Sequence, residues 1–381
     1  QLTNLHHHRL IQLLLANQPR EWQPTAMRAS ALFIDRIPPQ AQALLELQND
    51  SFEYYQLSGS STVGKPICGV VERTPIERVE KLARLMAPLK IEGGTKGGNS
   101  SLPRNVRLVE LLGATQPTGI NLAELYSQTY DPNKIMSFPI GINLALKQQI
   151  VTLREDGRGG HGPHAMLAGG TGKGKSVTLQ SIVLSLAATN SPEHLNIVLA
   201  DFKGGASELA RLKPLPHIVG FVTDLDEAYV ERFRLSLEGE VRRRKRLLEE
   251  TPALVGRQIP DIYEYNKMMP QKLLPHLLIV IDEFAKALQI NPAFKTTLDK
   301  DIAAQGRALG IHLILSTQKP ADFAALRPNL EVRMSMQVQS PEDSRIIFNR
   351  NDAHSKLERA GQAFLQVGDN RVFEMFQVAH T

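Results

Sequence analysis

Residues 169–176, near the middle of the sequence, have the types and spacing of a phosphate-binding loop. They read GGTGKGKS, which matches the pattern G-x-x-x-x-G-K-[ST]. An apolar run at 164–168 predicts a buried strand before the loop, and apolar residues at helical spacing predict a helix over 177–186 after it. Glycines let backbone N–H groups face phosphates, and the start of a helix adds positive potential. The pattern therefore predicts a nucleotide site, with a chance glycine-rich turn as the alternative.

Two residues of this loop are predicted to contact the reacting end of ATP. Lys175 would reach the β- and γ-phosphates, and Ser176 would hold Mg²⁺ through its hydroxyl. ATP and Mg²⁺ are therefore the expected cofactors. The predicted nucleotide-binding residues are Gly169, Gly170, Thr171, Gly172, Lys173, Gly174, Lys175, Ser176 and Val177.

An acidic pair, Asp282 and Glu283, follows the apolar run 277–281, which predicts a second buried strand. An acid at the C-terminal end of such a strand can hold Mg²⁺, usually through water. A second acid beside it can orient and polarise an attacking water molecule. We therefore expect Asp282 on the metal side and Glu283 in the hydrolytic role, with a solvated strand end as the alternative.

A polar side chain, Gln318, comes directly after another predicted strand at 312–317. In a parallel sheet the C-terminal ends of the strands converge on the ligand. Gln318 is therefore predicted to sense the γ-phosphate or to hold the attacking water. The alternative is a polar loop residue with ordinary hydrogen-bond partners.

A positive charge must also meet the γ-phosphate, and it often comes from an arginine of another subunit. For any single arginine, a surface salt bridge is the commoner role. The candidates are Arg232, Arg243, Arg244 and Arg307.

Residues 242–246 read RRRKR, a run that suggests nucleic acid or acidic lipid as a partner. A solvated helix face beside Glu249 and Glu250 explains the run equally well. The formal net charge of +5 agrees with a polyanionic partner, but a single basic helix could supply it.

These residues need a scaffold, and the chain of 381 residues is long enough for one or two domains. From residue 102 onward, strand and helix patterns alternate, which predicts an α/β fold with a mainly parallel sheet. A long helix is predicted over 225–250, and 368–370 reads as a hairpin turn. The predicted strands are 164–168, 195–201, 277–281, 312–317, 332–338, 363–367 and 372–378.

The first hundred residues lack the regular alternation of strand and helix patterns, and their short mixed signals predict a smaller N-terminal α+β module. Helical spacing covers 1–20 and 76–86, and short β-type runs occur at 31–34 and 68–71. The glycine- and serine-rich stretch at 93–101 is typical of a flexible linker, or of a long surface loop. We therefore expect a module at 1–92, a linker at 93–101 and the α/β domain at 102–381.

The compartment is predicted from cysteine usage and hydropathy. A single cysteine, Cys68, excludes an internal disulfide and suits a reducing, cytoplasmic setting. No apolar run approaches the roughly 18 residues that a membrane span requires. Because the chain begins with Gln1 instead of Met, we expect an excerpt of a longer protein, and its other parts could tether it to the membrane.

Taken together, these motifs resemble the motor domain of the FtsK/SpoIIIE family over about residues 102–378. Lys173 departs from the family pattern, which usually has serine there. The stretches that carry the resemblance are GPH at 162–164, DFKGG at 201–205, LPHIV at 215–219, VTD at 222–224, PHLLIVIDEF at 275–284, GRALGIHL at 306–313 and TQKP at 317–320.

Several stretches are closer to the EccC/EssC secretion ATPases of that family than to its DNA pumps. They are 201–205, 102–104 with 108–113, and Arg232 followed by 239–240 and 243–244. In the secretion enzymes an arginine at the position of Arg232 resembles the finger that acts across a subunit interface. This resemblance places Arg232 ahead of Arg307.

The resemblance implies a RecA-like P-loop ATPase that works as a homo-oligomer, a hexameric ring, and moves a polymer through its centre. We expect double-stranded DNA as the polymer, from the family's DNA pumps and the net positive charge. A secreted polypeptide is the alternative, supported by the closer motif match. A nucleotide-binding scaffold without hydrolysis is the third possibility, against which Glu283 argues.

Overall fold

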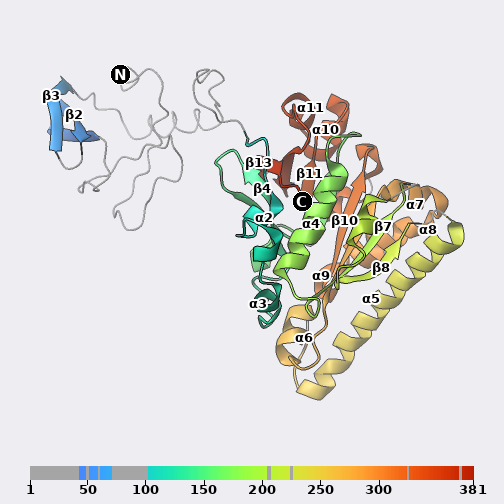
Figure 1. Cartoon of the computed structure of the whole chain (residues 1–381). Coiled ribbons are helices and arrows are strands. Elements are labelled where there is room, and N and C mark those ends of the chain that lie inside the picture. Colours follow the sequence, from blue (N-terminus) through green and yellow to red (C-terminus); the bar gives the residue numbers. More distant parts are fainter. Residues whose placement is uncertain are drawn as a thin grey trace. The chain divides into compact units, whose positions relative to one another are not determined.

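The computed structural model describes residues 43–48, 51–58, 61–70, 102–203, 207–223, 226–323, 326–368 and 371–381 (Figure 1). The chain divides into two compact units, Gln1–Asn99 and Ser100–Thr381, and each is described by itself. The predicted helices at 1–20 and 76–86, the run at 31–34 and the linker at 93–101 lie outside the described residues. The boundaries at 92 and 101 stay a prediction.

The first unit contains a three-stranded antiparallel sheet in the order β1-β2-β3. Its strands are β1 (Ala43–Gln48), β2 (Ser51–Ser58) and β3 (Ser61–Val70). The predicted run at 68–71 coincides with the end of β3, whereas β1 and β2 were not predicted. Residues 45–48 (LELQ) do alternate apolar and polar side chains, but four residues are the shortest run that indicates a strand.

The second unit is built on a ten-stranded sheet in the order β5-β4-β13-β12-β11-β6-β10-β9-β7-β8. The six strands from β11 to β8 are parallel, and the four from β5 to β12 join antiparallel. The strands are β4 (Ser137–Asn143), β5 (Gln148–Thr152), β6 (His164–Ala168), β7 (Leu195–Asp201), β8 (Ile218–Val222), β9 (His276–Asp282), β10 (Ile311–Thr317), β11 (Val332–Ser335), β12 (Gln362–Val367) and β13 (Val372–Val378).

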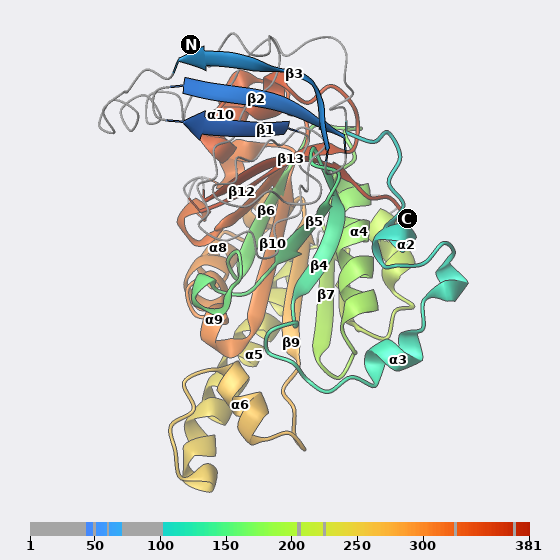
Figure 2. The same cartoon turned by 90° about the vertical axis from the view of Figure 1, so that its left-hand side faces the viewer.

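Helices cover both faces of this sheet, with α3 and α4 on one side and α8 and α9 on the other (Figure 2). The α-helices are α2 (Leu108–Leu111), α3 (Leu122–Tyr126), α4 (Lys175–Thr189), α5 (Glu227–Val255), α6 (Ile262–Met268), α7 (Phe284–Ile290), α8 (Ala293–Thr296), α9 (Gly306–Leu309), α10 (Pro341–Phe348) and α11 (Asp352–Ser355). Short 3₁₀ turns and one π-helical segment, η5 (Thr297–Ala303), complete the described elements. None of the helices in the described part of the chain is long and apolar enough to cross a membrane.

The α/β fold and its largely parallel sheet agree with the sequence prediction. Strands β6, β9 and β10 are buried at every position, which explains why they read as continuous apolar runs. Three strands were missed, for local reasons. β4 contains Pro139 and a bulge, β5 begins with two glutamines, and β8 is a half-buried edge strand.

Three buried histidines lie at the N-terminal ends of neighbouring strands, opposite the strand ends that carry the predicted acids. His312 Nδ1 lies 3.3 Å from the carbonyl of Pro163 and can only donate to it, so its Nε2 must accept. His276 Nδ1 therefore donates to His312 Nε2 at 2.9 Å, and Tyr130 donates its hydroxyl to His276 Nε2 at 3.0 Å. The chain of bonds fixes both imidazoles as neutral tautomers. His164, the third member, is also fully buried.

Candidate nucleotide-binding site

The phosphate-binding loop lies between the buried strand β6 and helix α4, as the sequence predicted. Gly172 and Gly174 have φ angles of 75° and 103°, a left-handed conformation that glycine adopts without steric cost. Gly174 is also the residue that precedes the helix. Three backbone N–H groups at the start of α4 are left without partners within the helix, so this end of the helix can receive an anion.

Segments from far along the chain brace the loop. Gly361, just before β12, donates its N–H to the carbonyl of Lys173 at 3.0 Å, and Gly170 donates to the carbonyl of Gln337 at 2.9 Å. A Cβ atom on Gly169 would come within 2.8 Å of the Met336 side chain, so glycine is required there by close packing. The segments that follow β11 and precede β12 therefore hold the loop in shape.

Lys175 points inward and joins the loop to the predicted acidic pair. Its side chain is buried, and Nζ donates to Asp282 Oδ1, to Glu283 Oε1 at 2.9 Å and to Ser316 Oγ at 3.1 Å. Ser316 also donates its hydroxyl to Asp282 Oδ1 at 2.8 Å. Two carboxylates around one ammonium leave an excess of negative charge, which favours a further cation at this strand end.

Glu283 is held in an uncommon backbone conformation. Its φ of 53° and ψ of 43° are left-handed, and only a few per cent of residues other than glycine adopt such angles. The residue sits between β9 and α7, and its N–H donates to Asp282 Oδ1 at 3.0 Å. The turn aims both carboxylates at Lys175. Strain of this kind, worth about 1–3 kcal/mol, concentrates at functional sites.

Gln318 and Ser176 complete the group of predicted residues that the structure brings together. Thr171 in the loop donates its hydroxyl to Gln318 Oε1 at 2.7 Å, so the end of β10 reaches the loop. Ser176 is partly exposed, and Lys203 Nζ lies 3.3 Å from its Oγ. Sequence reasoning gave no role to Ser316 or to Lys203. The signal for both was available, because each lies at or just beyond the end of a parallel strand.

The four candidate arginines lie elsewhere. None of them makes a hydrogen bond or ion pair with residues 169–177 among the described residues. Arg232 is exposed on α5, and its guanidinium carbon lies 5.2 Å from the centre of the Tyr229 ring. The role of Arg232 across a subunit interface stays a prediction.

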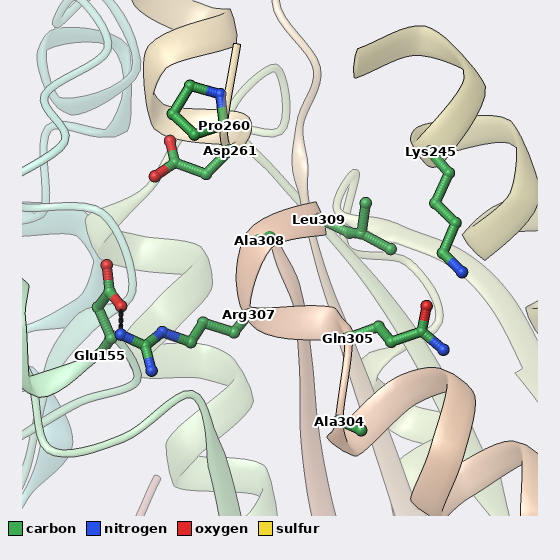
Figure 3. Close-up of a pocket in the computed structure, with 9 residues that line it drawn as sticks. All are labelled: Glu155, Lys245, Pro260, Asp261, Ala304, Gln305, Arg307, Ala308 and Leu309. Atoms are coloured by element: carbon green, nitrogen blue, oxygen red, sulfur yellow. Dashed lines mark ion pairs between the residues drawn. The ribbon is translucent and has the colours of Figure 1, made fainter. Parts of the chain in front are cut away.

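Arg307 is engaged within its own chain. It forms an ion pair with Glu155 at the rim of a cavity of about 400 Å³ (Figure 3). Arg158 links the same Glu155 at 2.9 Å to Asp261 at 2.6 Å. The other residues that line the cavity are Lys245, Pro260, Ala304, Gln305, Ala308 and Leu309. No residue of the phosphate-binding loop lines it.

The basic run on α5 is largely occupied by intramolecular contacts. Arg244 is 2% exposed, pairs with Glu240 and donates to the carbonyls of Leu309 and Pro275, each at 2.8 Å. Arg243 is exposed but makes a two-pronged ion pair with the same Glu240, at 2.7 and 2.8 Å. Arg244 therefore anchors α5 to the sheet, and the run offers less free charge than its sequence suggested.

The residues present fit a magnesium ion bound together with ATP. Mg²⁺ keeps several waters and takes only one or two protein ligands besides phosphate oxygens. The hydroxyl of Ser176 and the carboxylate of Asp282 provide that number. In the described part of the chain no cluster of three His, Cys, Asp or Glu side chains forms a metal cage.

Comparison with known proteins gives one family and a consistent set of relatives. The sequence model of the FtsK/SpoIIIE family matches residues 122–322. The type VII secretion system protein EssC of Staphylococcus aureus is 34% identical over 287 residues, which is 74% of this chain and 18% of EssC. The chain thus spans under a fifth of that relative's length.

Solved structures agree on the fold. The cytoplasmic domain of the type VII secretion ATPase EccC from Thermomonospora curvata superposes with a TM-score of 0.67 at 30% identity, over 73% of this chain and 32% of that one. A structure of ATPases 2 and 3 of the same EccC, in complex with a signal sequence peptide, gives a TM-score of 0.58 at 22% identity, over 74% of this chain and 48% of that one. The second likeness concerns the fold alone.

Proposed function

Because the chain belongs to the FtsK/SpoIIIE family of P-loop ATPases, we propose that it is the ATP-hydrolysing module of a motor that exports polypeptides. The observation that carries the enzymatic part is the buried contact of Lys175 with Asp282 and Glu283, which joins the phosphate loop to the acidic pair. The similarity to secretion proteins supports a polypeptide as the exported polymer. These relatives favour a polypeptide over the double-stranded DNA expected from the family's DNA pumps and the net charge.

In this proposal each site residue has one task. The loop amides and Lys175 bind the β- and γ-phosphates of ATP, and Glu283 polarises the water that attacks the γ-phosphate in line. Gln318 senses that phosphate through its link to Thr171. Mg²⁺, when bound through Ser176 and Asp282, would neutralise charge on the phosphate oxygens.

The subunit would act in a ring on the cytoplasmic side of a membrane. Arg232 would then enter the site of the neighbouring subunit, since it is exposed and lies apart from its own loop. An arginine supplied in this way stabilises the charge of the transition state.

DNA is the weaker candidate for physical reasons as well. Duplex binding without base specificity depends on free Lys and Arg side chains that neutralise phosphates. In the run 242–246, Arg243 and Arg244 are already paired with Glu240. Arg242 also lies 3.9 Å from Glu238. A peptide partner does not require such a basic surface.

The test measures ATPase rate and binding with two polymers. A labelled secretion-signal peptide is expected to bind and to change the rate, and a scrambled peptide serves as its control. Labelled duplex DNA is titrated in parallel at several salt concentrations. If the duplex binds with a log–log salt slope of about −0.9 per neutralised phosphate and alone raises the rate, the motor is a DNA translocase.

A further inference from the structure

Lys203 brings a further positive charge to the nucleotide site, in addition to that of Lys175. It lies two residues beyond the end of β7, and its Nζ is 3.3 Å from the hydroxyl oxygen of Ser176. That hydroxyl is the one expected to hold Mg²⁺. The ammonium and the divalent cation therefore share one oxygen atom as their target.

The position of Lys203 is fixed on both sides by hydrogen bonds of its backbone. Its N–H donates to Asp201 Oδ1 at 3.0 Å, and its carbonyl accepts from Lys286 Nζ at 2.8 Å. Asp201 is itself held, because Ser207 donates a hydroxyl to its Oδ2 at 2.6 Å. The side chain therefore extends from a well-anchored turn, which lowers the entropy lost when it reaches Ser176.

The turn is also tied to the strand end that carries the acids. Asp201 and Asp282 are partners in the register of β7 and β9, and Phe202 donates its N–H to the carbonyl of Asp282 at 3.2 Å. Lys203 thus approaches Ser176 from the β7 side, whereas Lys175 approaches Asp282 from the loop. Lys175 is fully engaged with carboxylates, which leaves Lys203 as the cation nearest to Ser176 among the described contacts.

We propose that Lys203 is a stand-in for the divalent cation: it holds the Ser176 hydroxyl and offsets phosphate charge until Mg²⁺ displaces it. The inference rests on the proposed nucleotide site. Two cations cannot share one hydroxyl oxygen without strong repulsion, so the ammonium and Mg²⁺ compete. The competition sets the Mg²⁺ concentration that the site requires.

The experiment is an equilibrium titration of a fluorescent ATP analogue with the full chain, in EDTA and in excess Mg²⁺. In Lys203→Ala the dissociation constant in EDTA is expected to rise about tenfold, the size expected for loss of one charge-assisted hydrogen bond. With excess Mg²⁺ the change is expected to stay within about threefold. Lys203→Arg, which keeps the charge, is expected to restore most of the affinity in EDTA.

A second measurement, the Mg²⁺ concentration that the site requires, is expected to fall in the same variant whose dissociation constant in EDTA rises. At a fixed analogue concentration below saturation, the Mg²⁺ concentration that gives the half-maximal change in analogue binding is expected to fall in Lys203→Ala, because its competitor is gone. The matched control is Lys147→Ala, which removes the same charge from the exposed turn between β4 and β5. If the role of Lys203 were purely structural, Lys203→Ala would weaken binding of the analogue equally in EDTA and in excess Mg²⁺ and would leave the Mg²⁺ midpoint unchanged.

The outcomes separate this inference from the proposed function. If Lys203→Ala matches Lys147→Ala in EDTA, or if the wild-type protein binds the analogue only with Mg²⁺, the stand-in role is wrong while the nucleotide site remains. If the wild-type protein binds no analogue even with Mg²⁺, the nucleotide site itself is wrong, and the inference is overturned with it.

Discussion

The ammonium of Lys175 is shared between two carboxylates and a hydroxyl, so in the proposed function ATP would have to exchange these partners for its own phosphates. A buried ion pair is weak evidence for stability, because desolvation offsets much of the attraction. Phosphate oxygens would replace Asp282 and Glu283 as partners of Lys175, and a cation would then have to compensate the carboxylates that the ammonium leaves. In the proposed function, moving Lys175 would free Glu283 to accept a hydrogen bond from water. A single movement of Lys175 would then both bind ATP and prepare Glu283.

This exchange predicts that two substitutions separate binding from turnover. Lys175→Ala is expected to abolish ATP binding, because the cation that meets the phosphates is lost. Glu283→Gln is expected to keep binding and to lower the hydrolysis rate about 10²-fold or more, because the amide cannot polarise water. Binding is measured by titration and turnover by phosphate release. Wild-type rates in Glu283→Gln would show that another residue acts on the water.

At the scale of elements, the two ends of the parallel strands have opposite characters. The C-terminal ends of β9 and β10 carry the polar residues of the site, whereas the N-terminal ends of β6, β9 and β10 carry the histidines. Burial lowers the pKa of His164 to about 4 and that of His312 to about 3. Burial also holds the pKa of His276 well below its usual value, with the charge of Arg244 and the neighbouring His312 adding to the effect.

These histidines predict a loss of stability in mild acid. In the unfolded chain each would titrate near 6.5, whereas in the folded protein each stays neutral at that pH. Below about pH 6.5 the unfolded state therefore binds more protons, and the free energy of unfolding falls by up to about 1.4 kcal/mol per pH unit for each histidine. Above pH 6.5 the histidines no longer lower the free energy of unfolding. Urea unfolding between pH 7.5 and 5 measures the slope.

His164→Gln is the matched variant, because glutamine is polar but does not titrate. Its stability is expected to fall less steeply with acid, by up to about 1.4 kcal/mol per pH unit relative to the wild-type protein. Equal slopes for the two proteins would mean that His164 does not remain neutral when folded.

At the scale of the whole molecule, the sequence predicted where the loop and the acidic pair lie more fully than it predicted the outer strands of the sheet. The loop at 169–176 and the acids at the end of β9 could be placed because motif and apolar run lie side by side in the chain. Gln318 was expected near the ligand only from the rule that parallel strand ends converge, and its hydrogen bond with Thr171 was not predicted. β5 was missed because an edge strand buries less and so shows a weaker pattern, and β4 because Pro139 and a bulge interrupt it. The brace at Gly361 could not be predicted, since nothing local links it to residue 173.

The whole assembly is tested by mixing two inactive subunits. Arg232→Ala lacks the proposed finger, and Lys175→Ala lacks the proposed phosphate ligand. In a ring, an Arg232→Ala site beside a Lys175→Ala subunit regains an arginine, so the mixture is expected to recover part of the ATPase rate. Arg307→Ala in place of Arg232→Ala is the control, because Arg307 pairs with Glu155 in its own chain. An inert mixture of subunits that still form rings would contradict the role of Arg232.

The hydrogen bond from Gly361 to Lys173 also has a consequence for the order in which the site is finished during synthesis. Gly361 leaves the ribosome 185 residues after Ser176. At about 5–20 residues per second, the nascent loop waits roughly 10–40 s for its brace. Strand β6 also waits, because its partners β10 and β11 both come later in the chain. The emerging polypeptide thus contains the sequence of the phosphate-binding loop long before that loop is held in its final shape. The loop therefore gains its hydrogen bond from Gly361 only after the segment that precedes β12 has been synthesised.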